Sequence, residues 1–206
     1  MIKRVFFLFL CAVLALSLKA QHPGYMGKRF TVGGEFAYGY TGFELTPFNM
    51  HYGVFGSFIL TRKLQLCFTG INYNNKLSGI TGYGYNRLSG YSAMLEMRFY
   101  RSKRIGAIAP IGKYVDVGLC YSDFTLHPRS GSQNLQNEPY FKIEDDAFMP
   151  YFGFGIQTVF FDCITADSGM RFGTYPFGIA KENRDYSRDV YEKFMINFFI
   201  RIGYLL

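Results

Sequence analysis

Beyond its first twenty residues, the sequence has no apolar run long enough to cross a bilayer as a helix. Such a helix needs roughly 20 consecutive apolar residues, and every later apolar region is interrupted by a polar or charged residue every few positions. This absence excludes a helical membrane protein. The 206 residues also contain no tryptophan and only 7 prolines, against 17 tyrosines, 23 phenylalanines and 23 glycines. Aromatic residues and glycines at this density favour β-strands over helices.

Cysteine is scarce as well. Beyond residue 20 only Cys67, Cys120 and Cys163 remain, an odd number that cannot pair fully within one chain. No C-x-x-C spacing indicates a metal site, so we interpret the three as isolated thiols and expect neither metal nor cofactor. The net charge is +7, and three of the positive charges lie in the first twenty residues. The remainder is only mildly basic, which does not indicate a nucleic-acid partner.

The N-terminus has the pattern of a secretory signal peptide. Lys3 and Arg4 precede an apolar run over 5–18, and Ala20 is a suitable residue before a cleavage point. The run is too short for a spanning helix. We therefore predict a cleaved signal peptide at 1–20 and a single domain at 21–206.

Eight segments alternate between the two faces of an extended chain with a period of two, which is typical of β-strands. They cover 28–41, 49–61, 64–73, 88–100, 113–124, 150–161, 164–174 and 194–206. The connections mostly alternate between longer and shorter, as in an antiparallel meander whose short turns share one end. The pattern predicts an all-β fold, an eight-stranded antiparallel up-and-down β-barrel.

The two faces of these segments differ in charge. One face carries large apolar side chains with hardly a charge, and the other carries glycines and seven charged residues, Glu35, Glu96, Arg98, Asp116, Asp167, Arg171 and Arg201. An eight-stranded lumen is just wide enough to be filled by side chains, so about thirty bulky apolar residues cannot fit inside. The charged face therefore points inward and the apolar face meets lipid, as in a transmembrane barrel. We predict a lumen charge network, with Arg201 paired to carboxylates such as Glu35 where the first strand closes on the last.

The signal peptide, the eight strands and the C-terminal segment 194–206 (FMINFFIRIGYLL) resemble the small outer-membrane β-barrel proteins of the OmpA/OmpX type. The string 109–114 (APIGKY) is similar to a periplasmic turn of such barrels. The resemblance implies an outer-membrane location with both termini in the periplasm, contact with outer-membrane lipid, and recognition of the last strand by the insertion machinery. The family's last strand usually ends on an aromatic residue, whereas this one ends Tyr204-Leu205-Leu206. We also expect a monomer.

For function, the sequence favours a non-enzymatic barrel without a wide pore, whose role is structural or lies in surface loops at 125–149 and 175–190. The acidic run Glu144-Asp145-Asp146 falls in the first of these loops and is interpreted as solvated surface. Five tyrosines toward strand ends suit the aromatic girdle of a membrane barrel: Tyr38, Tyr40, Tyr52, Tyr121 and Tyr204.

Two alternatives stay open at this point. The first is a membrane-lipid hydrolase that uses His127 and Ser130, because some barrels of this size hydrolyse lipids with a serine and a histidine. The second is a secreted soluble calyx that binds a ligand, because such a calyx has the same alternation with the opposite polarity.

Overall fold

The computed structural model describes residues 27–40, 49–76, 85–101, 111–128, 142–174 and 194–206, and every regular element in them is a β-strand. The eight strands are β1 (Phe30–Tyr40), β2 (Asn49–Thr61), β3 (Leu64–Lys76), β4 (Tyr85–Tyr100), β5 (Gly112–Pro128), β6 (Ile143–Phe160), β7 (Ile164–Thr174) and β8 (Phe194–Leu205). No helix long and apolar enough to cross a membrane occurs in these ranges. The expected signal peptide at 1–20 and the whole 175–190 connection lie outside the described residues, so the division into signal peptide and barrel domain stays a prediction.

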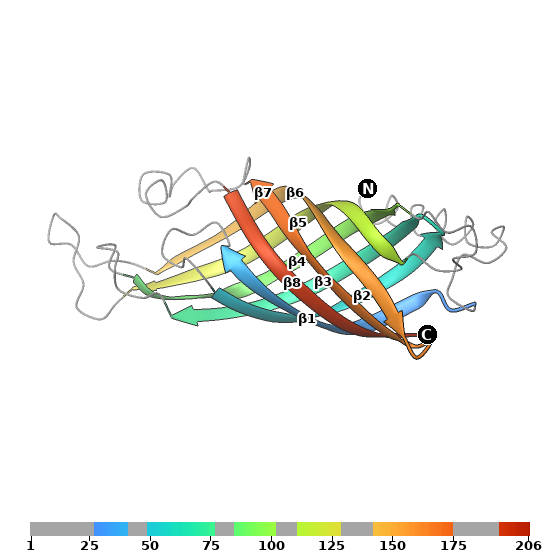
Figure 1. Cartoon of the computed structure of the whole chain (residues 1–206). Helices are drawn as coiled ribbons and strands as arrows, with labels where there is room; N and C mark the ends of the chain where they lie inside the picture. Colours follow the sequence, from blue (N-terminus) through green and yellow to red (C-terminus); the bar gives the residue numbers. More distant parts are fainter. Residues whose placement is uncertain (1–26, 41–48, 77–84, 102–110, 129–141, 175–193) are drawn as a thin grey trace, which may run out of the picture.

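The strands form one closed barrel in which each strand pairs with the next along the chain (Figure 1). All eight pairings are antiparallel, including the closure of β1 on β8, which runs from Thr31 opposite Leu205 to Tyr40 opposite Ile196. The predicted fold, an eight-stranded antiparallel up-and-down barrel, is confirmed. Closure leaves no sheet edge unpaired along the ring.

The side chains alternate between the lumen and the outer wall. On β8, Phe199 and Arg201 are buried, whereas their neighbours Phe198 and Ile200 are about half exposed. The same holds around the ring: seven charged residues of the strands are buried, and the outward positions along the middle of the strands are mostly aliphatic or aromatic. This polarity is the reverse of a soluble calyx, in which the apolar face points inward.

Glycines on the lumen side make room for aromatic rings on the neighbouring strand. Tyr151 lies over Gly118, and Tyr114 lies over Gly155, its partner in the β5–β6 register. A Cβ added to Gly118 would be 2.4 Å from Tyr151 Cζ, closer than any real contact. The glycine-rich inward face therefore serves packing, since aromatic rings on one strand cover glycines on the next.

The strand ends are where the sequence interpretation was wrong. The fifth and sixth strands were expected to end at 124 and begin at 150, but β5 continues to Pro128 and β6 begins at Ile143. The acidic run at 144–146 lies on β6, opposite residues 123–125 of β5, and not in a loop. The hydrophobic alternation fades there because the outward face becomes polar, although the backbone ladder continues.

The two ends of the barrel differ in their connections. Short turns join β2 to β3 and β6 to β7 at the end where β1 begins and β8 finishes. In the β6–β7 turn, Phe161 and Asp162 have φ values of 50° and 57°, and Cys163 N donates a hydrogen bond to Phe160 O over 3.2 Å. Two successive left-handed residues inside such a hydrogen bond are typical of a type I′ hairpin turn.

Candidate functional site, a charge cluster inside the barrel

Arg201 lies at the centre of a group of charged side chains inside the barrel. It is opposite Glu35 in the β1–β8 register, and its Nε donates a hydrogen bond to Glu35 Oε2. Its Nη1 is 2.5 Å from Glu96 Oε1, on the β4 side of the lumen. Its Nη2 donates to Thr69 Oγ1 over 2.7 Å. One guanidinium thus joins carboxylates of β1 and β4 across the lumen.

Arg171 of β7 binds the same two carboxylates from another side. Its Nη1 and Nη2 donate to the two oxygens of Glu35 over 2.6 and 3.0 Å, which is the bidentate geometry that arginine favours with a carboxylate. Its Nη2 also lies 3.2 Å from Glu96 Oε2. Glu35 and Glu96 are therefore each shared between Arg171 and Arg201.

Arg98 extends the cluster toward the short-turn end. Its Nη2 lies 2.7 Å from Glu96 Oε1, and its Nη1 lies 2.7 Å from Asp167 Oδ2. Asp167 Oδ1 accepts a hydrogen bond of 2.7 Å from Tyr114 Oη. Six of the seven predicted network residues are thus connected by ion pairs, and all six are at most 4% exposed.

Asp116, the seventh, is buried beside the cluster but not joined to it. It is 1% exposed and lies opposite Arg98 in the β4–β5 register, yet neither of its oxygens has a hydrogen-bond partner. Its carboxylate packs on Gly153, where an added Cβ would be 2.6 Å from Asp116 Oδ1. The three arginines thus pair with three of the four carboxylates.

Aromatic and amide side chains complete the filling of the lumen, and sequence reasoning did not single them out as site residues. The Phe199 ring lies 4.0 Å from Arg171 Cζ and 4.9 Å from Arg201 Cζ, so it stacks on two guanidinium groups. Tyr151 Oη donates to Glu96 Oε2 over 3.0 Å. Tyr100 Oη lies 2.5 Å from Gln65 Oε1 and 2.9 Å from Gln157 Oε1. Their inward register was the signal that could have identified them.

The cluster is suited to hold the barrel together and to fill it. The side chains of Glu35, Arg171 and Arg201 have no solvent-exposed area. No group of three or more potential metal-ligating side chains occurs in the described ranges. Two of the three cysteines, Cys67 and Cys120, are buried on the lumen side, and all three are free thiols.

Comparison with known proteins gives a fold but no close relative. The sequence matches no protein-family model and no curated protein. Solved structures do match. The N-terminal β-barrel domain of Pseudomonas aeruginosa OprF superposes with a TM-score of 0.53 at 14% identity, over 87% of this chain and 98% of that one. Neisserial surface protein A gives 0.53 at 12% identity, over 86% and 96%. The fold is that of the small outer-membrane β-barrels.

A third such barrel, the outer membrane protein OprG of Pseudomonas aeruginosa, gives a TM-score of 0.52 at 12% identity, over 90% of this chain and 97% of that one. These identities are low, so the likeness concerns the fold. It confirms the resemblance to OmpA/OmpX-type barrels at the level of architecture.

The histidine considered for catalysis lies on the outer wall of this outer-membrane-type barrel. His127 Nε2 is 2.8 Å from Ser89 Oγ, near the end of β4 and β5 that carries the longer connections. Ser130, its expected partner, lies outside the described residues. Glu144 on the neighbouring strand accepts a hydrogen bond from Lys142. In the described part of the chain no carboxylate hydrogen-bonds to His127 to orient it, so a serine and a histidine alone make an incomplete site.

Proposed function

We propose that the chain is an integral outer-membrane barrel that is closed by its own charge cluster, with a structural or loop-presenting role and no catalytic one. The observation that carries this proposal is the polarity of the wall. Three arginines and four carboxylates are buried inside, and the outward positions of the same strands are apolar. Only hydrocarbon outside the barrel makes that arrangement favourable, because water would leave the outer wall as one large exposed apolar patch.

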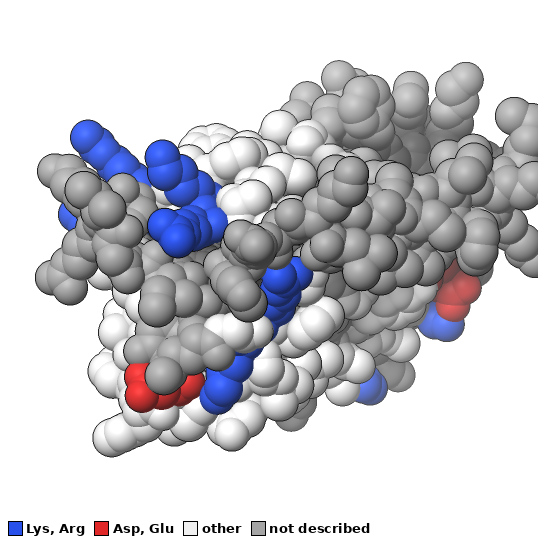
Figure 2. Space-filling view, turned by 90° about the vertical axis from the view of Figure 1, so that its right-hand side faces the viewer, with Lys and Arg blue, Asp and Glu red and all other residues white. Residues whose placement is uncertain are grey.

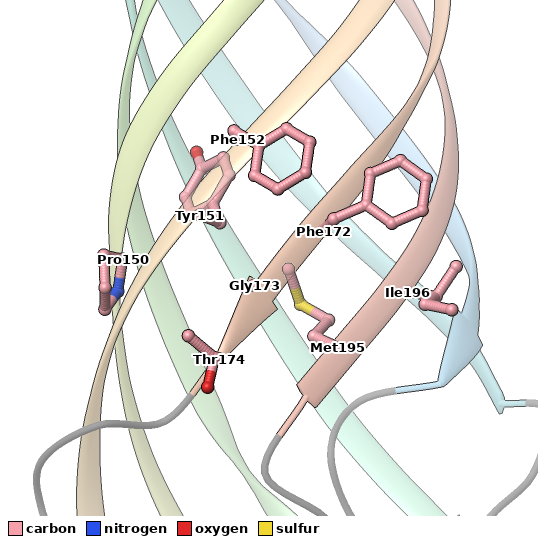
Figure 3. A pocket seen from close by; sticks show the side chains of 8 residues that line it. All are labelled: Pro150, Tyr151, Phe152, Phe172, Gly173, Thr174, Met195 and Ile196. Atoms are coloured by element: carbon pink, nitrogen blue, oxygen red, sulfur yellow. The ribbon is translucent and has the colours of Figure 1, made fainter.

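The outer wall supports contact with lipid in detail. Outward residues include Val54, Phe152 and Ile202, each at least 60% exposed. Between β6, β7 and β8 an apolar groove of about 470 Å³ opens on this wall (Figure 3). It is lined by Pro150, Tyr151, Phe152, Phe172, Gly173, Thr174, Met195 and Ile196. The outward members of this lining, Phe152, Phe172 and Ile196, suit contact with lipid acyl chains.

Aromatic residues suit the two interfaces of a bilayer. Tyr38 and Tyr52 lie toward the end with the longer connections, and Tyr204 lies toward the end with the short turns; all three are outward and at least 40% exposed. Tyr121 is also outward and half-buried, and the side chain of Tyr40 lies outside the described residues. We place the short-turn end in the periplasm, as in barrels of this type. The start of β1 and the end of β8 lie at that end, so both termini of the chain would be periplasmic. Recognition of β8 by the insertion machinery and a monomeric state belong to the same proposal.

The cluster supports a lumen without a wide pore. Glu35 on β1, Glu96 on β4 and Arg171 on β7 come from strands spaced around the ring, and they meet inside it through contacts of 2.6 to 3.2 Å. Side chains that meet across an eight-stranded lumen leave no continuous channel of porin width. The charged side chains of the lumen bind one another in ion pairs and do not line an open water-filled channel.

The two alternatives have less support. A soluble calyx requires an apolar interior and a polar exterior, and the wall has the opposite polarity. A lipid hydrolase using His127 has a nearby serine in Ser89, but in the described ranges no carboxylate is hydrogen-bonded to the histidine to orient it. Purified protein is expected to release no fatty acid from phospholipid vesicles. Hydrolysis that is abolished by both His127→Ala and Ser89→Ala would revive the hydrolase.

Cell fractionation tests the main proposal. The chain is expected in the outer-membrane fraction after alkaline extraction, and unboiled samples are expected to migrate faster on a denaturing gel than boiled ones. Protease added to intact cells should cut at the longer connections and spare the short turns. In planar bilayers the purified protein should give no porin-sized conductance. A protein recovered in the aqueous fraction, or large conductance steps, would contradict the proposal.

A further inference from the structure

The short-turn end of the barrel carries a group of cationic residues, which we call the basic rim. It consists of Lys28, Arg29, Arg62, Lys63, Arg101 and Lys113. Arg62, Lys63, Arg101 and Lys113 are exposed, and the other two are half-buried. Figure 2 views the molecule from this end and shows Lys and Arg side chains gathered there, with few acidic ones. In the described ranges, Asp162 is the one acidic side chain at this end.

Two of these cations lie on the outer wall, directly next to apolar residues. Arg101 N donates a hydrogen bond to Lys113 O over 3.1 Å, so the two residues are neighbours across β4 and β5. They are two residues from Phe99 and Val115, which are opposite each other and outward, with exposures of 44% and 57%. The alternation of the strands gives Arg101 and Lys113 the same outward register. The two cations are thus the next outward residues beyond the apolar face of the wall.

Two other parts of the basic rim lie close to residues of the barrel wall. Tyr100 N donates to Lys63 O over 2.8 Å, which brings the β2–β3 turn beside Arg101. On the far side of the ring, Lys28 Nζ lies 5.7 Å from the centroid of the outward Tyr204 ring and donates to the backbone oxygen of Asp162 over 3.3 Å. Lys28 is therefore held over the outer wall and not over the lumen.

The opposite end has no such excess of one sign. Arg87 Nε donates to Asn74 Oδ1 over 2.7 Å, and Lys142 is paired with Glu144. Asp123 and Asp146 also lie near that end, in the extended parts of β5 and β6. The two ends of the barrel thus differ in charge, and the cations are concentrated at the short-turn end.

We propose that the basic rim binds the phosphate headgroups of anionic phospholipids in the leaflet on that side. This inference rests on the proposed membrane location. Cations one step beyond an apolar band lie at the depth of the headgroups, and long Lys and Arg side chains reach that level while their stems cover apolar surface. Each cation near an anionic surface contributes to binding. Because the cations adjoin Phe99, Val115 and Tyr204 on the outer wall, a membrane lipid fits better than a soluble acidic partner.

The test uses the full chain folded in a neutral detergent, titrated with phosphatidylglycerol or phosphatidylcholine and followed by native mass spectrometry. Phosphatidylglycerol should bind more tightly than phosphatidylcholine. The fourfold variant Arg62→Gln/Lys63→Gln/Arg101→Gln/Lys113→Gln should lose affinity for phosphatidylglycerol by at least about tenfold at low salt, with phosphatidylcholine binding unchanged. The control variant Arg87→Gln/Lys142→Gln, at the other end, should bind both lipids as the natural chain does.

Further arms separate the possible outcomes. Equal affinity of the fourfold variant and the natural chain for phosphatidylglycerol would overturn the inference. So would a preference of the rim for soluble polyglutamate or free glycerophosphate over the lipid. Insertion of the chain into phosphatidylcholine vesicles, read as faster migration of unboiled samples, tests the membrane location separately. If the chain inserts but shows no lipid preference, only the inference about the rim fails.

Discussion

Glu35 and Arg201 lie opposite each other on β1 and β8, and Arg201 Nε donates a hydrogen bond to Glu35 Oε2. These two strands are the first and last of the barrel, so the ion pair forms only when the ring closes. A slip of β8 by one residue would turn Arg201 out into the lipid and leave Glu35 in the lumen without this partner. The buried pair therefore favours a single register for closure.

Loss of Arg201 should destabilise the barrel strongly. In Arg201→Met the Glu35 and Glu96 carboxylates keep only part of their partners, and a buried charge that loses its partner costs about 3–5 kcal/mol. Urea unfolding in lipid vesicles, followed by the mobility of unboiled samples on gels, measures the loss. The double variant Glu35→Gln/Arg201→Met should cost less than the sum of the single variants, because the residues are in contact. Additive costs would argue against the pair.

Asp116 and Asp167 should respond differently to the loss of charge. Asp116 has no hydrogen-bond partner, so Asp116→Asn removes a buried charge that nothing pairs with, and stability should stay the same or rise by up to about 1 kcal/mol. Asp167→Asn removes the carboxylate that lies 2.7 Å from Arg98 and should cost about 1–3 kcal/mol. The same urea titrations compare the two. Equal losses would show that Asp116 has a partner in solution.

Adding one methyl group to a lumen glycine should be costly. In Gly155→Ala the new Cβ would be 2.4 Å from Tyr114 Oη and 2.6 Å from Ser168 O, so the ring or the strand must move, at about 1–3 kcal/mol. Gly56→Ala is the matched control, because nothing lies within 4 Å of the added Cβ. Thermal unfolding in micelles should show a lower midpoint for the first variant alone. A tolerated Gly155→Ala would argue against tight packing of Tyr114.

The β6–β7 turn offers a stabilising substitution. Phe161 has a φ of 50°, in the left-handed region that costs an ordinary residue about 1–2 kcal/mol. Asparagine tolerates this region, so Phe161→Asn should raise stability in detergent micelles by roughly 1 kcal/mol. Arg62→Asn, in the β2–β3 turn where the backbone shows no positive φ, should give no gain. If Phe161→Asn left the stability unchanged, the turn would have another conformation.

The sequence was sufficient to predict which residues face the lumen. A period of two assigns every residue of a strand once the polarity of one face is known, and Glu35, Glu96 and Arg201 are all buried as their register requires. The chain direction and the closure of β1 on β8 followed from the number of strands and the lengths of their connections. These features depend on local patterns that can be read within each segment of the sequence.

The partners inside the lumen could not be predicted in the same way. Glu96 meets Arg171 and Arg201 because of how far each strand is shifted along its neighbour. This shift cannot be derived from the residues of one strand alone. The isolation of Asp116 also depends on it. The ends of β5 and β6 were missed for another reason: beyond the apolar band the outward face becomes polar, as Asp123 and Asp146 show, and a pattern based on an apolar outer face no longer marks the strand.

Tryptophan fluorescence tests most directly which face of the wall meets lipid. The natural chain has no tryptophan, so a single one reports without background. Phe198 is outward and Phe199 is inward on the same strand. In vesicles of brominated phospholipid, Phe198→Trp should be strongly quenched and Phe199→Trp should not, and Val54→Trp and Phe55→Trp repeat the comparison on β2. Stronger quenching at the inward positions, or equal quenching at both, would contradict a barrel with its charges inside and its apolar face in hydrocarbon.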